Sequence, residues 1–180
     1  MADRPLDDHE AFAAVFDAHF DEIHRYVAYR LGPDNAEDVV GETFLIAFRK
    51  RAQFDPSRAA AKTWLYGIAT NLIGKHRRQE ARTLRALSRC APDRDTPGHE
   101  DRVVVQVAAE SLRQDLAAAL AELDQRDRDV VQLLALAGLS HEEVAVALGI
   151  PNGTVRSRLN RARKKLRGSL SLVLQEADRG

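Results

Sequence analysis

The 180-residue chain has few residues of several types, and each scarcity excludes a class of protein. It has a single cysteine, Cys90, so an internal disulfide and a cysteine-based zinc cluster are both excluded. No apolar run approaches the ~20 residues of a membrane-spanning helix, and the first residues lack the apolar core of a signal peptide. We therefore expect a cytoplasmic protein without membrane insertion.

The chain also lacks a net charge, since 27 basic residues balance 27 acidic ones. Taken alone, this balance argues against a nucleic-acid-binding protein. The distribution of the charges reverses that conclusion, because acids gather in residues 7–22 and 115–129 and bases in residues 75–89 and 156–167. Two separate basic segments on a neutral molecule are typical of a nucleic-acid binder.

Residue patterns for catalysis and cofactor binding are missing as well. The six histidines show no metal-ligand spacing, no Gly-Lys-Ser/Thr phosphate loop occurs, and no Ser/His/Asp set is evident. The sequence therefore predicts no catalytic residues, no metal and no cofactor. A nucleic-acid enzyme is the alternative that these absences argue against, and we interpret Cys90 as an incidental thiol.

The apolar positions follow a helical period, and no segment shows a convincing alternating strand pattern. The period predicts helices over residues 10–31, 35–54, 63–78, 112–123 and 126–137, followed by a helix-turn-helix. Between residues 81 and 101 the pattern gives way to Arg, Asp, Pro and Gly, which indicates a linker. We expect an all-α protein with a helical domain over residues 10–81, a flexible linker over 82–100 and a second helical domain over 101–172.

The predicted linker is long enough for the two domains to act apart. About twenty residues, extended at ~3.3–3.6 Å each, span roughly 65–70 Å. That length is near two turns of duplex DNA at ~34 Å per turn. We therefore expect two modules on a tether that occupy separate DNA sites.

The most informative segment is residues 140–161, which has the residue types of a helix-turn-helix. Gly149 falls in the predicted turn, where a positive φ costs least, and the small Ala145 falls where the helices approach. The second helix has one apolar stripe, made of Val155, Leu159, Ala162 and Leu166. Its other faces carry seven bases and no acid: Arg156, Arg158, Arg161, Arg163, Lys164, Lys165 and Arg167. This pattern is typical of a recognition helix in the major groove, and a helical hairpin with a solvated basic face is the alternative.

The helix predicted over residues 63–78 is the second informative segment. Its buried stripe consists of Trp64, Leu65, Ile68, Ala69 and Leu72, and its opposite face carries Gly67, Thr70, Asn71 and Gly74. Each glycine inside a helix costs ~1 kcal/mol relative to Ala, so we expect another backbone to approach this face. Nucleic acid is one candidate, since Asn71 can bond a base edge and Trp64 with Tyr66 can supply stacking surface. A core Trp with a glycine-tolerant surface explains these residues equally well.

A third segment, residues 36–48, places an acidic face beside apolar positions that the sequence leaves exposed. The acids are Glu37, Asp38 and Glu42. Acidic helix faces are usually only solvated, and a protein-docking surface is the alternative.

With these three segments in order around a linker, the chain resembles a bacterial sigma factor of the extracytoplasmic-function group over residues 11–172. Residues 36–44 resemble the region that grips the clamp helices of core RNA polymerase. Residues 54–78 resemble the region that melts and reads the minus-ten promoter element, and residues 153–163 resemble the reader of the minus-thirty-five element. The resemblance implies a transcription initiation factor, monomeric when free, with core RNA polymerase and promoter DNA as partners and an anti-sigma factor as a further candidate.

The resemblance also assigns residues to each contact. For polymerase binding they are Glu37, Asp38, Val39, Glu42 and Thr43. For the minus-ten element they are Lys62, Trp64, Gly67, Thr70, Asn71, Lys75, Arg77 and Arg78, with residues 57–62 as the wall of a pocket in which Asn71 captures a flipped base. For the minus-thirty-five element they are Thr154, Arg156, Ser157, Arg158, Asn160, Arg161 and Lys164, of which Arg158 and Lys164 are phosphate contacts.

An ordinary helix-turn-helix regulator that binds an operator as a dimer is the alternative function. It accounts for the C-terminal helices but gives no role to residues 63–78 or to the acidic face of residues 36–48. Dimerisation in solution and palindromic footprints without polymerase would support it.

Overall fold

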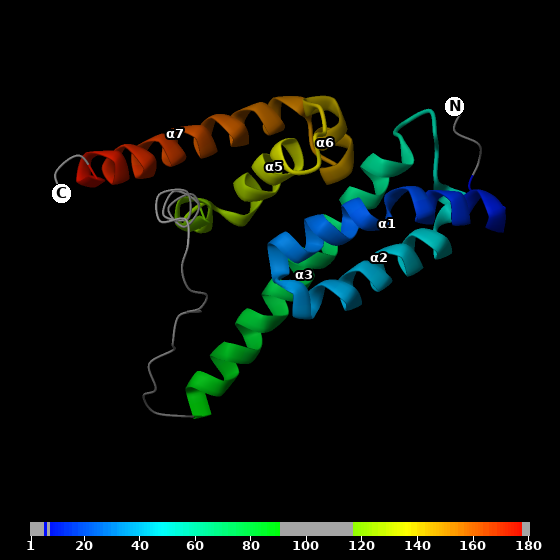
Figure 1. Ribbon diagram of the computed structural model, residues 1–180, viewed down its shortest axis with the longest axis horizontal. Coiled ribbons are helices and arrows are strands. Elements are labelled where there is room, and N and C mark those ends of the chain that lie inside the picture. Colours follow the sequence, from blue (N-terminus) through cyan, green and yellow to red (C-terminus); the bar gives the residue numbers. More distant parts are fainter. Residues whose placement is uncertain (1–5, 7, 91–116, 178–180) are drawn as a thin grey trace.

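The computed structural model describes residues 6, 8–90 and 117–177, and every regular element within these ranges is a helix (Figure 1). The N-terminal module, residues 8–90, contains α1 (His9–Leu31), α2 (Ala36–Arg49) and α3 (Ala61–Cys90), with 3₁₀ turns at Pro33–Asn35 and Arg51–Gln53. The C-terminal module, residues 117–177, has a helical segment over residues 117–121, then α5 (Gln125–Ala135), α6 (His141–Leu148) and α7 (Asn152–Ala177). The prediction of an all-α fold with a helix-turn-helix is confirmed.

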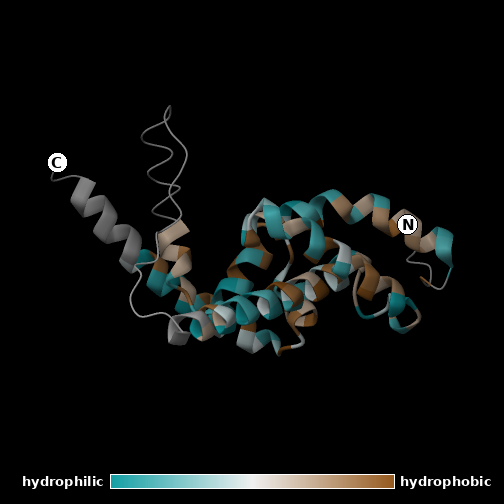
Figure 2. Ribbon diagram, turned by 90° about the horizontal axis from the view of Figure 1, so that it is seen from below, coloured by the Kyte–Doolittle hydropathy of each residue, from teal (hydrophilic) through white to brown (hydrophobic). Residues whose placement is uncertain are grey.

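The N-terminal module is a three-helix bundle in which each helix buries one apolar face. Its fully buried side chains include Ile23 and Val27 of α1, Val40 of α2, and Leu65 and Ile73 of α3. Figure 2 shows hydrophilic and hydrophobic residues alternating around the helices, as expected for amphipathic helices. Within the described ranges, no helix combines the length and apolar character needed to cross a bilayer.

Helix α3 departs most from the prediction. It was expected to end near Arg78 and continues to Cys90, so residues 82–90 of the predicted linker are helical. Residues 79–90 contain no Gly or Pro and are rich in Ala, Leu and Arg, which are good helix formers. The first helix-breaking residue after this stretch is Pro92. The rest of the predicted linker lies outside the described residues.

Helix α2 is shorter than predicted, and α1 matches its prediction closely. α2 ends at Arg49 instead of Phe54, and the chain tightens into the 3₁₀ turn Arg51–Gln53, as is common at helix C-termini. α1 ends at Leu31, and the next residue, Gly32, has a φ of 82°. That angle is in the left-handed region, which explains why a Gly-Pro pair ends this helix.

The C-terminal module confirms the predicted turn and the predicted buried stripe, except that Leu166 is only half-buried. Gly149 ends α6 with a φ of 62°, and the α7 residues Val155, Leu159 and Ala162 are buried. Val155 and Leu159 of α7 belong to one core with Val130 and Leu133 of α5 and Val144 of α6. The α6 helix therefore packs into this core and leads through the Gly149 turn into α7.

The N-terminus of α6 carries a signal that the sequence reading missed. The Ser140 Oγ accepts a hydrogen bond from the Glu143 N–H at 3.2 Å, and Glu143 Oε2 accepts one from the Ser140 N–H at 2.8 Å. This reciprocal pair is a capping box, and its Ser-x-x-Glu pattern is visible in the sequence.

The two modules lie against each other, which differs from the expectation of two separate modules on a tether. Helix α6 packs on α3, and α5 also contacts α3 (Figure 1). The contact joins the turn side of the helix-turn-helix to the face of the N-terminal bundle that carries the second informative segment.

We predict that Ser140→Ala lowers the free energy of unfolding by about 1 kcal/mol, because it removes the side-chain cap of α6. Ser140→Asp keeps an acceptor and should stay near the wild type, and Ser140→Gly should cost only a few tenths of a kcal/mol. Urea denaturation followed by circular dichroism measures the series. Equal stability of Ser140→Ala and the wild type would show that the capping box adds nothing.

Candidate nucleic-acid interface

The first candidate surface is the N-terminal half of α7. Its exposed side chains are Arg156, Ser157, Asn160, Arg161, Arg163 and Lys164, and those of Thr154 and Arg158 are half-buried. The first residue of the helix, Asn152, holds it to α6, because its Nδ2 donates to Glu142 Oε1 at 3.0 Å. Exposed bases and amides above a buried apolar stripe give α7 a polar, positively charged outer face.

Arg161 differs from the other polar residues on this face. Its Nε and Nη2 donate to Oδ2 and Oδ1 of Asp127 at 3.1 and 2.8 Å. Asp127 lies in the first turn of α5 and is buried. These hydrogen bonds raise the pKa of Arg161 above its ordinary value. Arg161, which the sequence analysis assigns to the minus-thirty-five element, therefore also joins α7 to α5.

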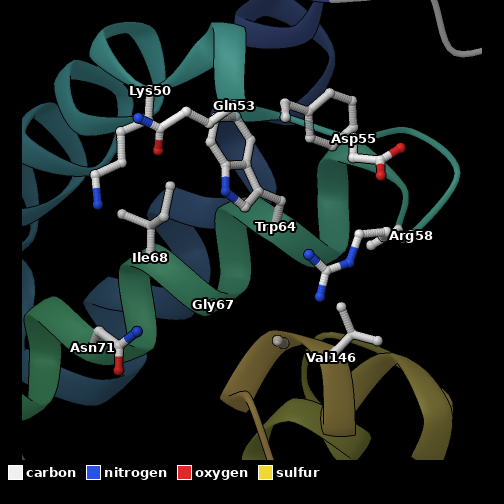
Figure 3. A pocket seen from close by; sticks show the side chains of 12 residues that line it. Lys50, Gln53, Asp55, Arg58, Trp64, Gly67, Ile68, Asn71 and Val146 are labelled. Atoms are coloured by element: carbon white, nitrogen blue, oxygen red, sulfur yellow. The ribbon is translucent and has the colours of Figure 1, made fainter.

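The second candidate surface is a pocket of about 360 Å³ beside α3 (Figure 3). This volume falls in the ~300–1,000 Å³ range of small-molecule sites. The lining residues are Lys50, Gln53, Phe54, Asp55, Arg58, Ala59, Trp64, Gly67, Ile68, Asn71, Val146 and Ala147. The pocket thus brings together three residues that the sequence assigned to the minus-ten contact, Trp64, Gly67 and Asn71.

The buried stripe of α3 is rotated relative to the prediction. Leu65, Ala69 and Leu72 are buried as expected, whereas Trp64 and Ile68 are only half-buried and face the pocket. The indole of Trp64 packs on Phe54, with ring centroids 5.1 Å apart. A large ring held by one neighbour and open on its other side forms a wall suitable for stacking.

The roles predicted for Tyr66 and Thr70 are wrong, because both side chains point into the bundle. Tyr66 and Thr70 are buried against Tyr26 of α1. The Thr70 hydroxyl shares a 2.9 Å hydrogen bond with the Tyr26 hydroxyl, and the two tyrosine rings meet edge to face. Burial raises the pKa values of both phenols. Asn71, by contrast, is exposed.

The basic residues predicted near the minus-ten element divide into two groups. Lys62 pairs with Glu22 at 3.1 Å, Lys75 pairs with Glu42 at 3.4 Å, and Arg78 is exposed. Arg77 instead turns toward the C-terminal module. It donates from Nη1 to Gln125 Oε1 at 2.9 Å and from Nη2 to the Arg30 carbonyl at 2.7 Å, and burial lowers its pKa.

The acidic face of α2 is exposed, but two residues assigned to it are not. Glu37, Asp38 and Glu42 lie on the surface, whereas Val39 and Thr43 are buried. The Thr43 hydroxyl donates to the Val39 carbonyl at 2.7 Å, so it is satisfied within the helix. These two side chains therefore belong to the core. Their helical spacing with the apolar residues Ala36, Val40, Phe44 and Ala47 is the sequence signal that places them there.

Gly67 confirms that another backbone approaches α3, and that backbone is part of the same chain. A Cβ atom at Gly67 would lie 2.6 Å from the carbonyl oxygen of Ala147 in α6. Gly74 has a looser surrounding, since a Cβ there would lie 3.4 Å from Nη1 of Arg78. The sequence reading missed Val146 and Ala147 as pocket residues, because a helical pattern shows which face is small and not what packs on it.

The described part of the chain contains no cluster of side chains suited to hold a metal ion. No group of three or more His, Cys, Asp or Glu side chains there is arranged to hold an ion.

Comparison with known proteins gives a consistent result for both modules. The family described as sigma-70 region 2 matches residues 15–83, and the family described as sigma-70, region 4 matches residues 113–166. The sigma factor SigE of Mycolicibacterium smegmatis is 38% identical over 156 residues, which cover 85% of this chain and 59% of SigE. SigL of Mycobacterium tuberculosis is 36% identical over 165 residues, which cover 91% of this chain and 88% of SigL.

A solved structure is similar across both modules. The structure of CnrH in complex with the cytosolic domain of CnrY aligns with a TM-score of 0.64 at 27% identity. The alignment covers 96% of this chain and 99% of CnrH. The chain therefore spans less than two thirds of SigE, but nearly the whole length of SigL and of CnrH.

We predict that Arg161→Ala lowers the melting temperature and that Asp127→Asn lowers it in a non-additive way, because both changes break the same α5–α7 pair. Arg156→Ala is the matched control, since it removes an exposed arginine of α7 that does not bond Asp127. Thermal melts of the three single variants and of the Arg161/Asp127 double variant measure the coupling. If Arg161→Ala melts like Arg156→Ala, Arg161 does not clamp the two helices.

Proposed function

Because the chain belongs to the extracytoplasmic-function sigma factors of the sigma-70 family, we propose that it directs core RNA polymerase to promoters by dividing the promoter between its two modules. The C-terminal module reads the minus-thirty-five element, and the N-terminal module opens and holds the minus-ten element. Sigma factors are initiation factors and not enzymes. Acting on polymerase and chromosomal DNA places the protein in the cytoplasm, where an anti-sigma factor is a further partner.

The observation that carries the minus-ten assignment is the pocket beside α3. Figure 3 shows Trp64, Gly67 and Asn71 along one stretch of this helix, opposite Lys50 and Arg58. An aromatic wall offers stacking to any base, and an amide offers both a donor and an acceptor to a base edge. Neither contact is made by a base inside the duplex, so the site favours a base that has left the stack.

The surroundings of the pocket supply the charge that a DNA strand needs. Arg58 and Ala59 of the preceding loop line the pocket, in keeping with a loop that forms its wall. Beyond Asn71 along the same helix, Lys75 and Arg78 are exposed. Cations at these positions neutralise phosphates on either side of a captured base.

The minus-thirty-five assignment rests on the exposed face of α7. Arg156 matches guanine by two parallel hydrogen bonds, and Asn160 matches adenine in the same way. Lys164 lies about two turns beyond Arg156 on the same helix, and its ammonium group suits a phosphate as a point charge. Arg161 can contact a base only through N–H groups that do not bond Asp127, since its Nε and Nη2 already donate to that carboxylate.

Polymerase docking is assigned to the exposed acids of α2. Glu37, Asp38 and Glu42 form the charged part of this face, and Leu45 adds an exposed apolar side chain. Charge complementarity steers and orients protein partners more than it adds affinity. A single exposed acidic helix beside apolar surface therefore suits docking on a basic surface of a larger enzyme.

We predict that Arg156→Ala and Lys164→Ala damage promoter binding in different ways. Loss of a base contact should remove about 1–3 kcal/mol of discrimination at one position of the minus-thirty-five element. Loss of a phosphate contact should weaken all sequences alike and reduce the salt slope by about one. Holoenzyme binding to wild-type and singly substituted elements at two salt concentrations separates the two. Equal, sequence-blind losses would reduce α7 to a phosphate clamp.

We predict that Asn71→Ala impairs promoter opening more than closed-complex formation, because its amide meets a base only after unstacking. Losing this contact removes part of what offsets an unstacking cost of a few kcal/mol. The measurement compares run-off transcription on a fully paired promoter with one mismatched across the minus-ten element.

Pre-melting should rescue Asn71→Ala in part, since the template then supplies the unpairing. Asn160→Ala is the matched control, because it removes an exposed amide from α7 and its defect should not respond to pre-melting. Wild-type activity of Asn71→Ala on paired DNA would return Asn71 to an ordinary surface residue.

A further inference from the structure

A carboxylate from outside α7 holds one of the arginines that the proposed function assigns to the minus-thirty-five element. Arg161 donates from Nε and Nη2 to the two carboxylate oxygens of Asp127 in α5, at 3.1 and 2.8 Å. The Arg161 side chain is nevertheless 61% exposed, whereas the Asp127 side chain is only 10% exposed. The pair therefore fixes one edge of the guanidinium and leaves the rest of it open to solvent.

The shape of the guanidinium decides what the open part can still bind. The group is planar and carries its N–H donors in a fixed, fork-shaped arrangement. Asp127 takes the edge formed by Nε and Nη2. The edge formed by Nη1 and Nη2 keeps a pair of parallel N–H groups, because each of these nitrogens carries a second hydrogen. Such a pair matches the O6 and N7 acceptors that guanine presents in the major groove, so the contact with Asp127 is compatible with guanine recognition.

Several contacts hold the part of α5 that carries Asp127. Asp127 lies in the first turn of the helix, where the helix dipole favours a negative charge. The next residue, Arg128, donates to the carbonyls of Leu120 and Leu123 at 2.7 and 2.8 Å and so ties this turn to the preceding segment. The body of α5 packs along α7 (Figure 1). The carboxylate therefore has a defined position beside α7.

Arg161 itself lies on the exposed side of α7. Ser157 precedes it by about one turn and is also exposed, while Leu159 and Ala162 are buried. An arginine on such a face loses the conformational freedom of a long side chain when it binds a base. Asp127 has already restricted the guanidinium before DNA arrives, so less freedom remains to be lost on binding.

We propose that Asp127 is a positioning residue for base recognition, which orients Arg161 so that its Nη1/Nη2 edge reads a guanine of the minus-thirty-five element. This inference rests on the proposed function, because it needs α7 to be the helix in the major groove. Asp127 acts only through Arg161, since its own side chain is nearly buried. Its contribution is therefore to discrimination between bases at one position.

The test measures the base preference of the holoenzyme, formed from core polymerase and the full chain, along the minus-thirty-five element. Binding is determined on promoter fragments that carry each single base-pair substitution. Arg161→Ala identifies the position that Arg161 reads, where we expect the preference for guanine to fall by about 5- to 150-fold. Asp127→Ala should lower the preference at the same position by about 2- to 10-fold, because Arg161 is present but no longer oriented.

Two further substitutions of Asp127 separate the loss of its carboxylate from a failure to fold. Asp127→Asn keeps the volume of the side chain and replaces one acceptor with a donor, so it should lower the guanine preference even if Asp127→Ala does not fold. Asp127→Glu keeps a carboxylate and should restore part of the preference.

The matched control is Asp124→Ala, which weakens the same end of α5 by another route. The Asp124 side chain caps this helix by accepting a hydrogen bond from the Arg126 N–H at 2.9 Å, and it does not bond Arg161. Any loss of binding that this variant causes should be equal for all sequences. Thermal melts establish that the Asp124 and Asp127 variants are compared at similar losses of stability.

The double variant Arg161→Ala/Asp127→Ala should show the same preference as Arg161→Ala alone, since Asp127 acts through Arg161. If Asp127→Ala weakens binding equally for all sequences, as the control does, Asp127 only stabilises the domain and the inference is wrong. If Asp127→Ala instead strengthens binding to all sequences, the pair withholds Arg161 from DNA, which also overturns the inference.

A further comparison distinguishes failure of this inference from failure of the proposed function. If Arg161→Ala changes no base preference and only reduces the salt dependence, Arg161 is a phosphate contact and Asp127 has no base reader to position. Arg156→Ala should still change the preference at its own position in that case. If Arg156→Ala changes no preference either, α7 does not read the minus-thirty-five element, and the proposed function fails together with the inference.

Discussion

The arrangement of this molecule depends on the missing side chain of Gly67. Helix α6 approaches α3 so closely that a methyl group at Gly67 would overlap the Ala147 carbonyl, so the contact exists only because the residue is glycine. A glycine inside a helix weakens that helix, by ~1 kcal/mol relative to Ala. The glycine instead allows the backbone of α6 to approach closely. This approach brings the helix-turn-helix against the N-terminal bundle.

Charged side chains reinforce this steric contact. Arg30 is buried at the boundary, and a buried cation needs a carboxylate partner, which Asp129 supplies from the other module. This buried ion pair lies beside apolar side chains of both modules that are fully enclosed, among them Leu65 and Leu133. Apolar packing also joins the modules, because Leu65 of α3 belongs to the same cluster of buried apolar side chains as Leu133 of α5 and Val144 of α6.

Polar residues of one helix differ in role according to the face on which they lie. On α3, Thr70 and Asn71 are neighbours in the chain, yet the first bonds Tyr26 inside the bundle and the second is exposed at the pocket. On α7, Arg156 is free of the α5 core and Arg161 is paired with Asp127. A shift of one residue moves a side chain by about 100° around a helix, which is enough to change its role.

The sequence by itself determined the helices, the helix-turn-helix and its Gly149 turn, because apolar periodicity and glycine conformation act within a few residues. It also led us to expect that another backbone approaches the face of α3 that carries Gly67. Only the tertiary structure decided which backbone that is, that Thr70 bonds Tyr26 inside the bundle, and that Arg77 and Arg161 are held by Gln125 and Asp127. These outcomes depend on residues 34 or more positions apart in the chain, and no local pattern records which distant side chain lies opposite.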